Sequence, residues 1–316
     1  MRIPPSPDSS VDNVYALLRD VPFPLRPLPT PEKITRVVAR LRALKMEIVD
    51  ELIVPWSSVG SEICTPFFPN RFQATFKGEM SAYQAWRDEI LMKKAIAFQL
   101  RRGDPVTPVG VLRALSLICR TPNVFRAQIA RFVYERFCPM GGRVWDACAG
   151  FGGRALGAHA AGVRYVGTDV DAETVEGNRR LIEQLGARGE VFACPAEIFD
   201  PPEVDLVFTS PPYFDRERYS HNENQSWKKY GRDLDAWVAG FLCPMIQNAR
   251  RALRAGGHLV LNVADLRERG TVIPIVDRTV AAALGAGFIH VRTLWMPLAA
   301  IKKTLPSEPL LVFRLT

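Results

Sequence analysis

The stretch RVWDACAGFGG, residues 143–153, decides the fold of this chain. Its first residues predict a short buried β-strand, which ends at Asp146 and runs into a turn that contains three glycines. Glycine permits a tight strand-to-helix turn and lets the backbone approach a ligand, and a carboxylate at a strand end can hold a cationic or hydroxyl group. A tight turn with no ligand has the same pattern, so the following strands carry the argument.

Six further β-rich runs follow, and helical or mixed connections separate the earlier ones. The runs are RYVGTD (164–169), GEVFAC (189–194), DLVFTS (205–210), HLVLNV (258–263), FIHVRTLW (288–295) and PLLVFRL (309–315). Strands that alternate with helices form a parallel sheet with right-handed crossovers. The last two runs are joined by a linker too short and too rich in proline for a crossover helix, so we expect them to pair antiparallel.

Polar signals stand at the ends of these strands. The second strand ends at Asp169, 23 residues after Asp146, where a carboxylate can accept hydrogen bonds from both hydroxyl groups of a ribose. The third ends at residues 194–196, Cys-Pro-Ala, and the fourth runs into residues 210–213, Ser-Pro-Pro-Tyr. Ligands of open α/β sheets bind at the carboxyl edge, so the four signals together predict a binding site there.

These motifs resemble those of the S-adenosylmethionine-dependent amino-methyltransferases that alkylate exocyclic amines of DNA bases. DACAGFGG (146–153) resembles their cofactor loop, and TSPPY (209–213) resembles their catalytic motif. TPNVFRAQIARFVYERF (121–137) resembles the helix over the methionine end of the cofactor. The resemblance implies a Rossmann-like class I methyltransferase fold, with a seven-stranded, mostly parallel sheet whose last strand is inserted antiparallel.

The resemblance also implies which residues bind S-adenosylmethionine. Asp169, followed by Val170, would take the ribose hydroxyls, and Phe125 would lie over the amino-acid end. The loop residues that would wrap the methionine and ribose are Asp146, Ala147, Gly150, Phe151, Gly152 and Gly153. The residues that would flank the adenine are Cys194, Pro195, Ala196 and Glu197.

In this family a serine before Pro-Pro-Tyr is typical of enzymes that act on N4 of cytosine. The resemblance therefore implies that Ser210, Pro211, Pro212 and Tyr213 hold a flipped base. An aromatic amine is a poor nucleophile, and hydrogen bonds from its N–H groups to the Ser210 hydroxyl and the Pro211 carbonyl would free its lone pair. Positioning and electrostatics would do the rest, and Tyr213 would stack on the base.

The segment after this motif mixes basic and aromatic residues, among them Arg216, Arg218, Trp227 and Lys228. Such a mixture suits a loop that closes over nucleic acid, and a solvated loop with anchoring aromatics has the same composition. The four residues are therefore candidates for substrate binding.

The basic charge of the chain is concentrated in its amino-terminal part. Residues 1–140 carry 20 Lys and Arg against 13 Asp and Glu, which is +7 of the net +8. Nucleic acid is a partner that fits this surplus, although ordinary surface charge fits it too. We expect a Pro-rich extended segment at 1–30, a basic and mainly helical region at 31–120, and the methyltransferase domain at 121–316.

Two expectations concern the front region. Thr30 and the pattern of residues 32–52 predict one amphipathic helix. The catalytic region leaves no room for a target-recognition domain, so the region before residue 121 or a partner protein would read the substrate.

Several classes of protein are disfavoured by composition. The six cysteines form no C-x-x-C pair and no cluster with histidine, so neither a metal site nor disulfides are indicated. No apolar run is long enough for a bilayer and the amino terminus lacks a signal-like core, so we expect a cytoplasmic protein.

Alternatives remain open for acceptor, donor and activity. The acceptor could be adenine N6, RNA or a small-molecule amine, and the donor could be carboxy-S-adenosylmethionine. A third alternative is a catalytically idle relative that binds nucleic acid.

Overall fold

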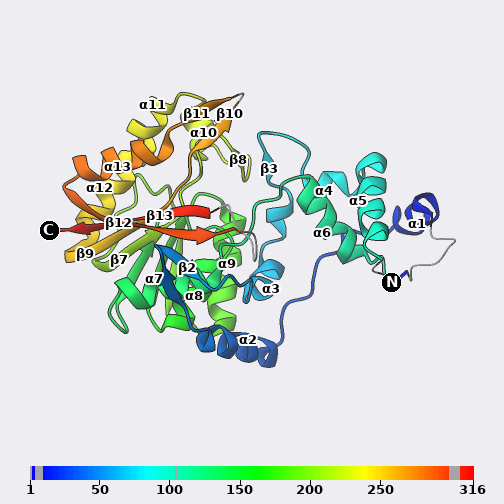
Figure 1. Ribbon diagram of the computed structural model, residues 1–316, viewed down its shortest axis with the longest axis horizontal. Helices are drawn as coiled ribbons and strands as arrows, with labels where there is room; N and C mark the ends of the chain where they lie inside the picture. Colours follow the sequence, from blue (N-terminus) through cyan, green and yellow to red (C-terminus); the bar gives the residue numbers. More distant parts are fainter. Residues whose placement is uncertain (1, 4–9, 104, 269, 299–306) are drawn as a thin grey trace. The chain divides into compact units, whose positions relative to one another are not determined.

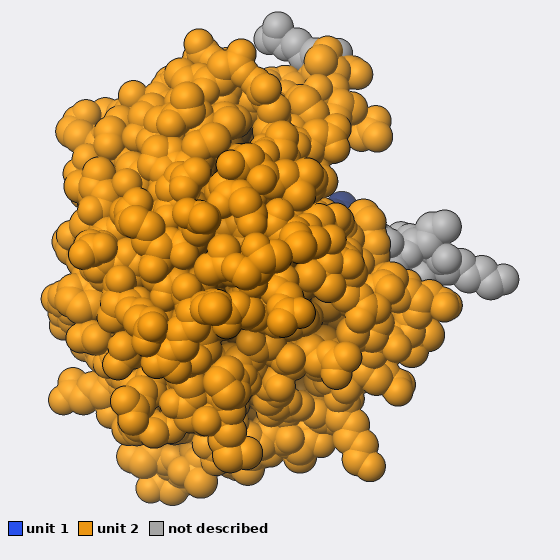
Figure 2. Space-filling view, turned by 90° about the vertical axis from the view of Figure 1, so that its left-hand side faces the viewer, with its two compact units in different colours: residues 1–28, 69–123, 216–221 blue, residues 29–68, 124–215, 222–316 orange. Residues whose placement is uncertain are grey.

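The computed structural model describes residues 2–3, 10–103, 105–268, 270–298 and 307–316. The chain divides into two compact units, coloured separately in Figure 2. Unit 1 contains residues 1–28, 69–123 and 216–221, and unit 2 contains residues 29–68, 124–215 and 222–316. Within the described ranges no helix is both long and apolar enough to cross a membrane.

Unit 2 is built on a sheet with the strand order β1-β2-β12-β13-β9-β7-β4-β5-β6 (Figure 1). Five adjacent strands run parallel: β6 (Gly189–Ala193), β5 (Arg164–Asp169), β4 (Arg143–Asp146), β7 (Val204–Thr209) and β9 (Leu253–Asn262). β13 (Ser307–Leu315) lies between β9 and β12 (Phe288–Pro297) and is antiparallel to both. All seven expected strands are present, and the Rossmann-like fold with an inserted antiparallel strand is confirmed. The linker expected between the last two strands falls largely outside the described residues.

Helices cover both faces of this sheet. One face carries α7 (Ala127–Phe137), α8 (Gly153–Ala161) and α9 (Ala172–Leu185), and the other carries η3 (Val238–Leu242), α12 (Cys243–Ala252) and α13 (Ile275–Gly285). Phe208 of β7 packs in the apolar cluster on the face with α7, α8 and α9, and its neighbour Val207 packs in the cluster on the face with η3, α12 and α13. Successive side chains of a strand point to opposite faces, so β7 is buried on both, as its uninterrupted apolar run indicates.

The amphipathic helix expected at residues 32–52 is shorter in the structure. α2 (Pro31–Ala43) begins after Thr30, whose hydroxyl accepts a hydrogen bond from the Lys33 N–H, and it ends at Ala43. The hairpin of β1 (Glu47–Val49) and β2 (Leu52–Val54) follows and extends the sheet to nine strands.

The prediction of helix beyond Ala43 was wrong because of the turn at Asp50 and Glu51. Both residues have positive φ, 49° and 63°, which is the backbone of a two-residue hairpin turn. The backbone N–H of Trp295 on β12 donates to the carbonyl of Glu51 at 2.7 Å, so the sheet edge provides hydrogen bonds that a helix would have made internally.

Unit 1 has its own apolar core. Its main helices are α1 (Val11–Leu18), α5 (Glu89–Arg101) and α6 (Pro108–Ile118), and buried Val14, Leu18 and Met92 pack between them. α1 lies in the segment expected to be extended, and it forms because Ser10 caps its first turn. The ribbon of β3 (Thr75–Phe76) and β8 (Glu217–Arg218) joins two distant parts of the chain.

Shorter elements complete the two units. Unit 1 also has η2 (Pro69–Phe72) and α4 (Ala82–Ala85). Unit 2 also has α3 (Ser61–Cys64), η1 (Thr65–Phe67), α10 (Ser226–Lys229), α11 (Leu234–Trp237) and the hairpin of β10 (Leu266–Glu268) and β11 (Thr271–Ile273).

Candidate functional site

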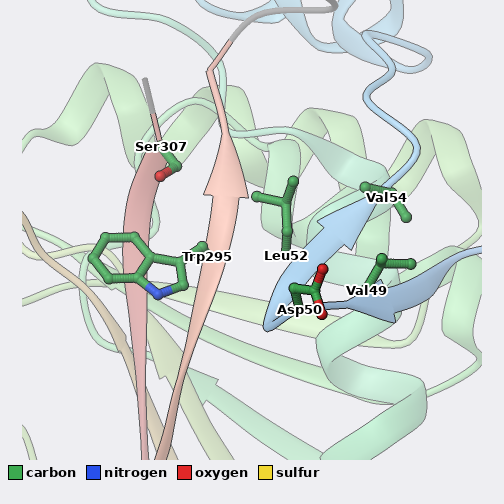
Figure 3. A pocket seen from close by; sticks show the side chains of 6 residues that line it. All are labelled: Val49, Asp50, Leu52, Val54, Trp295 and Ser307. Carbon is green, nitrogen blue, oxygen red and sulfur yellow. The ribbon is translucent and has the colours of Figure 1, made fainter. Parts of the chain in front are cut away.

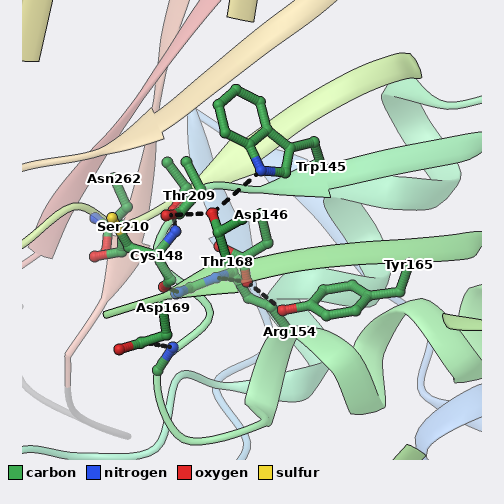
Figure 4. A network of polar contacts seen from close by, with 12 residues as sticks. Trp145, Asp146, Cys148, Arg154, Tyr165, Thr168, Asp169, Thr209, Ser210 and Asn262 are labelled. Atoms are coloured by element: carbon green, nitrogen blue, oxygen red, sulfur yellow. Dashed lines mark hydrogen bonds and ion pairs between the residues drawn. The ribbon is translucent and has the colours of Figure 1, made fainter. Parts of the chain in front are cut away.

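Asp146, the last residue of β4, holds the loop from β4 to α8 through its side-chain hydrogen bonds (Figure 4). This side chain is fully buried, and its Oδ2 accepts hydrogen bonds from Arg154 Nε and the Tyr165 hydroxyl, each at 2.7 Å. Burial opposes the charge of Arg154, but the adjacent carboxylate raises the pKa of the guanidinium above its ordinary value. Asp146 Oδ1 has no hydrogen-bond partner among the described residues. Asp146 therefore shapes the loop, and the next residue, Ala147, is also buried.

The three glycines of this loop have different reasons to be glycine. A Cβ on Gly153 would lie 1.9 Å from the carbonyl oxygen of Phe125, and one on Gly152, where φ is 78°, would lie 2.8 Å from Phe68. These two positions are fixed by packing within unit 2. Gly150 has φ of 54°, but a Cβ there would meet nothing closer than 3.8 Å. Gly150 is thus the loop glycine that leaves room for a ligand.

Two predicted aromatic residues support the loop from different sides. Phe151 is buried and packs edge-on against Phe68, with ring centroids 5.8 Å apart. Phe125 is half-buried between Phe208 of β7, at 5.6 Å, and the guanidinium of Arg154, 5.0 Å from its ring centroid. Phe125 is the more accessible of the two.

Asp169 connects the tip of β5 to the glycine loop. Its carboxylate accepts hydrogen bonds at 3.0 Å from the backbone N–H groups of Gly150 and Asp171. Burial nevertheless raises the pKa of this half-buried carboxyl from 3.8 to about 6. The carbonyl of the neighbouring Val170 is occupied by Asn222, whose Nδ2 donates to it at 2.7 Å. Asp169 thus presents a hydrogen-bond acceptor beside Gly150 whose charge changes with pH around pH 6.

The segment after β6 is also held at this edge. The N–H of Cys194 donates to the Asp169 carbonyl at 3.1 Å, and burial raises the pKa of the Cys194 thiol. Pro195 and Ala196 are buried, and Glu197 Oε1 accepts a hydrogen bond from Lys229 Nζ at 3.0 Å. The predicted adenine-flanking residues are therefore adjacent to Asp169, and the Glu197 carboxylate already has a partner.

The Ser-Pro-Pro-Tyr motif is organised by Asn262, which sequence reasoning missed. Asn262 Oδ1 lies 3.3 Å from the donating Oγ of Ser210 and 3.2 Å from the donating hydroxyl of Tyr213. The Asn262 amide is oriented by its Nδ2, which donates to the Pro309 carbonyl at 3.0 Å. Asn262 is the last residue of β9, and a polar residue at the end of an apolar strand was the signal that could have revealed it.

The remaining members of the motif are well packed. Tyr213 is 8% exposed, and its hydroxyl also lies 3.2 Å from Glu308 Oε2, so its proton is shared between two acceptors. Pro211 is buried and Pro212 is half-buried. The Tyr213 ring is therefore rigidly held, with little of its surface open.

The two predicted loops of unit 2 are joined directly. The backbone N–H of Cys148, in the glycine loop, donates at 3.0 Å to the hydroxyl of Thr209, which immediately precedes Ser210 (Figure 4). The site therefore combines the ends of β4, β5, β7 and β9 at one edge of the sheet.

Arg126 is a second residue that the sequence did not single out. Both of its terminal nitrogens, Nη1 and Nη2, are buried and have no hydrogen-bond partner among the described residues. Burial lowers the pKa of this guanidinium to about 10, and the charge of Glu308 opposes the shift. A buried cation without hydrogen-bond acceptors is costly, so the two terminal nitrogens of Arg126 could donate to an oxygen atom of a ligand.

The predicted substrate residues are divided between the units. Arg216 and Arg218 belong to unit 1, on or next to β8. Trp227 and Lys228 lie on α10 in unit 2, where Lys228 pairs with Glu223. The structure does not unite these four residues within one unit.

A hollow of about 580 Å³ lies at another place in unit 2, beside β1, β2 and β12 (Figure 3). Its lining is formed by Val49, Asp50, Leu52, Val54, Trp295 and Ser307. None of these is among the predicted site residues, but Ser307 directly precedes Glu308, which accepts a hydrogen bond from the Tyr213 hydroxyl.

Comparisons with known proteins give structural similarities. No family model matches the chain, and no curated protein matches it either. Similar solved structures include a methyltransferase from Pyrococcus furiosus, with 17% identity over 59% of this chain and 81% of that chain, and a TM-score of 0.39. A TehB-like SAM-dependent methyltransferase from Corynebacterium glutamicum has 17% identity over 65% and 95%, with a TM-score of 0.40.

A third similar structure is the 1,6-didemethyltoxoflavin-N1-methyltransferase of Burkholderia thailandensis with bound S-adenosylhomocysteine, with 16% identity over 60% and 78% and a TM-score of 0.40. The fold of this chain is established by the order and direction of its own strands, independently of these similarities.

Proposed function

We propose that this protein transfers a methyl group from S-adenosylmethionine to an exocyclic base amine, and specifically to N4 of cytosine in DNA. The observation that carries the proposal is the orientation of Ser210 by Asn262. The donor pocket and the acceptor class have separate support.

The residues at the sheet edge fit S-adenosylmethionine. Asp169 can accept hydrogen bonds from two ribose hydroxyls, and Gly150 leaves space beside it. The unpartnered guanidinium of Arg126 suits the α-carboxylate of the amino-acid part, because it can donate two parallel N–H groups to a carboxylate. When bound, the cofactor supplies a methyl group attached to a positively charged sulfur.

Ser210 is oriented to accept hydrogen bonds from an amine. Its single proton is directed at Asn262 Oδ1, so the lone pairs of Oγ remain for an incoming N–H group. Asn262 cannot readily reverse its amide, because Nδ2 donates to the Pro309 carbonyl. With the Pro211 carbonyl as second acceptor, both N–H bonds of an aromatic amine would be polarised, and the lone pair on nitrogen becomes available.

The cytosine N4 assignment rests on the serine at the start of the motif, which is typical of that specificity in the family that the sequence resembles. Because the Ser210 hydroxyl donates its proton to Asn262, it meets the substrate amine as a hydrogen-bond acceptor. Residues 31–120 or a partner protein would contribute target recognition.

The proposal is tested by incubating the full chain with tritiated S-adenosylmethionine and duplex DNA, single-stranded DNA, total RNA or free cytidine. We expect label in DNA, and a large loss of label with Ser210→Ala. Ser116→Ala, which removes a hydroxyl bonded within α6, serves as the matched control. Unchanged transfer by Ser210→Ala would overturn the catalytic assignment, and label only in RNA or cytidine would overturn the acceptor.

A further inference from the structure

Strands β3 and β8 form a two-stranded ribbon in unit 1 (Figure 1). Basic side chains lie around one aromatic ring of this ribbon. β3 and β8 pair antiparallel, with Thr75 opposite Arg218 and Phe76 opposite Glu217. The backbone N–H of Lys77 continues the pairing by donating to the Arg216 carbonyl at 2.9 Å. Residues more than 140 positions apart in the chain are thus fixed side by side.

Two arginines are held over Phe76. The guanidinium carbons of Arg120 and Arg216 lie 4.6 and 5.5 Å from the centroid of the Phe76 ring. The contact with the flat face of the ring fixes the plane of each guanidinium. Arg120 is exposed and forms no ion pair with any described residue. Its charge is therefore oriented but not neutralised.

The turn beside the ribbon is shaped around a third arginine. Gly78 has φ of 79°, and a Cβ there would lie 2.6 Å from Arg218 Nη1. Glycine therefore lets the guanidinium of Arg218 lie directly against the turn. Lys77, Arg120, Arg216 and Arg218 form what we call the basic ribbon.

The charge of unit 1 agrees with an anionic partner. Its residues include 14 Lys and Arg against 8 Asp and Glu, so these 89 residues carry +6 of the net +8 of the chain. Clustered Lys and Arg increase the affinity for a phosphate backbone because its counterions are released on binding. Arginines that are already held in one orientation lose less conformational entropy when they bind.

We propose that the basic ribbon binds the phosphate backbone of the nucleic acid on which the protein acts. The inference rests on the proposed function only in taking DNA as the acceptor. Arg216 follows Tyr213 by three positions in the chain. Contacts with the phosphate backbone hold the nucleic acid without reading its sequence.

The test is the anisotropy of a fluorescein-labelled 20-base-pair DNA duplex titrated with the full chain at several salt concentrations. Arg120→Gln and Arg216→Gln remove charge with little change of volume, and exposed Lys94 on α5 and Arg113 on α6 provide the controls Lys94→Gln and Arg113→Gln. We expect each ribbon variant to weaken binding about threefold to tenfold and to lower the slope of log K against log salt by about 1. The controls should leave both quantities unchanged.

Two further measurements separate this inference from the proposed function. Affinity for S-adenosylhomocysteine should be the same in all variants, which shows that the cofactor site of unit 2 is intact, and an unchanged far-UV circular dichroism spectrum shows that the helices of unit 1 are kept. Phe76→Leu should weaken DNA binding because the arginines lose their ring. If DNA binds and the ribbon variants behave like the controls, the inference is wrong and the proposed function stands. If the chain binds no DNA but methylates free cytidine, the inference and the DNA acceptor are both wrong, while amine methylation stands.

Discussion

If Asp169 binds the ribose of the cofactor as we propose, the titration of its carboxyl makes cofactor affinity depend on pH. Burial raises its pKa to about 6, so in the ligand-free protein it holds a proton at pH 5 and is ionised at pH 7.5. Ribose hydroxyls donate hydrogen bonds, and an ionised carboxylate accepts them better than a protonated one. Binding should therefore favour the ionised form.

The magnitude follows from linkage of one proton to binding. Below pH 6 the ionised fraction of Asp169 falls about tenfold for each further unit of acidity, so affinity should fall about tenfold between the plateau above pH 7 and pH 5. The stability of the ligand-free protein should change in the opposite direction. Because the folded-state pKa is raised from 3.8 to about 6, this group lowers the free energy of unfolding as pH rises from 4 to 6, by at most about 3 kcal/mol.

The assay is calorimetric titration of S-adenosylhomocysteine from pH 5 to pH 8, with thermal unfolding of the ligand-free protein over the same range. Asp169→Asn is the control, since its amide oxygen can still accept the Gly150 N–H but carries no titrating charge. The variant should bind about tenfold to a hundredfold more weakly at pH 7.5, with no pH dependence from this position. Equal affinity of the native protein at pH 5 and pH 8, or unchanged affinity in Asp169→Asn, would show that this carboxylate does not bind the ribose.

Three other substitutions test the remaining parts of the site. Arg126→Met should weaken binding of S-adenosylhomocysteine at least tenfold and leave its decarboxylated analogue unaffected; equal losses for both ligands would exclude a carboxylate contact. Asn262→Ala should lower kcat while affinity for S-adenosylhomocysteine is kept, because the Ser210 hydroxyl loses the acceptor that orients it; an unchanged kcat would contradict this role. Arg154→Met should lower the free energy of unfolding by about 3–5 kcal/mol, since Asp146 would be left charged and buried; a loss below about 1 kcal/mol in urea denaturation would show that the pair is unimportant.

Much of the fold could be predicted because it depends on local patterns. Apolar β-rich runs separated by helices were sufficient for the parallel sheet, and the capping residue Thr30 located the start of α2. The hairpin at residues 47–54 could not be predicted in this way, because its apolar residues also fit a helical period and the paired edge of β12 comes from a distant part of the chain.

The candidate site was predictable only where a motif is continuous in sequence. Asp146, Asp169 and Ser210 stand at strand ends and were found, but Asp146 is occupied by Arg154 and Tyr165, contacts that only tertiary structure shows. Asn262 was missed because its partner Ser210 follows a different strand. Arg126 was missed because only the structure shows that its terminal nitrogens are buried without a described partner.

The most direct test of the central claim is the chemical identity of the product. The full chain is incubated with duplex DNA and S-adenosylmethionine that carries a trideuterated methyl group, and the DNA is digested to nucleosides for chromatography and mass spectrometry. We expect trideuterated N4-methyldeoxycytidine as the product, and its loss with Ser210→Ala. Label on carbon 5 of cytosine, on N6 of adenine, or on no nucleoside in a protein that binds S-adenosylhomocysteine would contradict it.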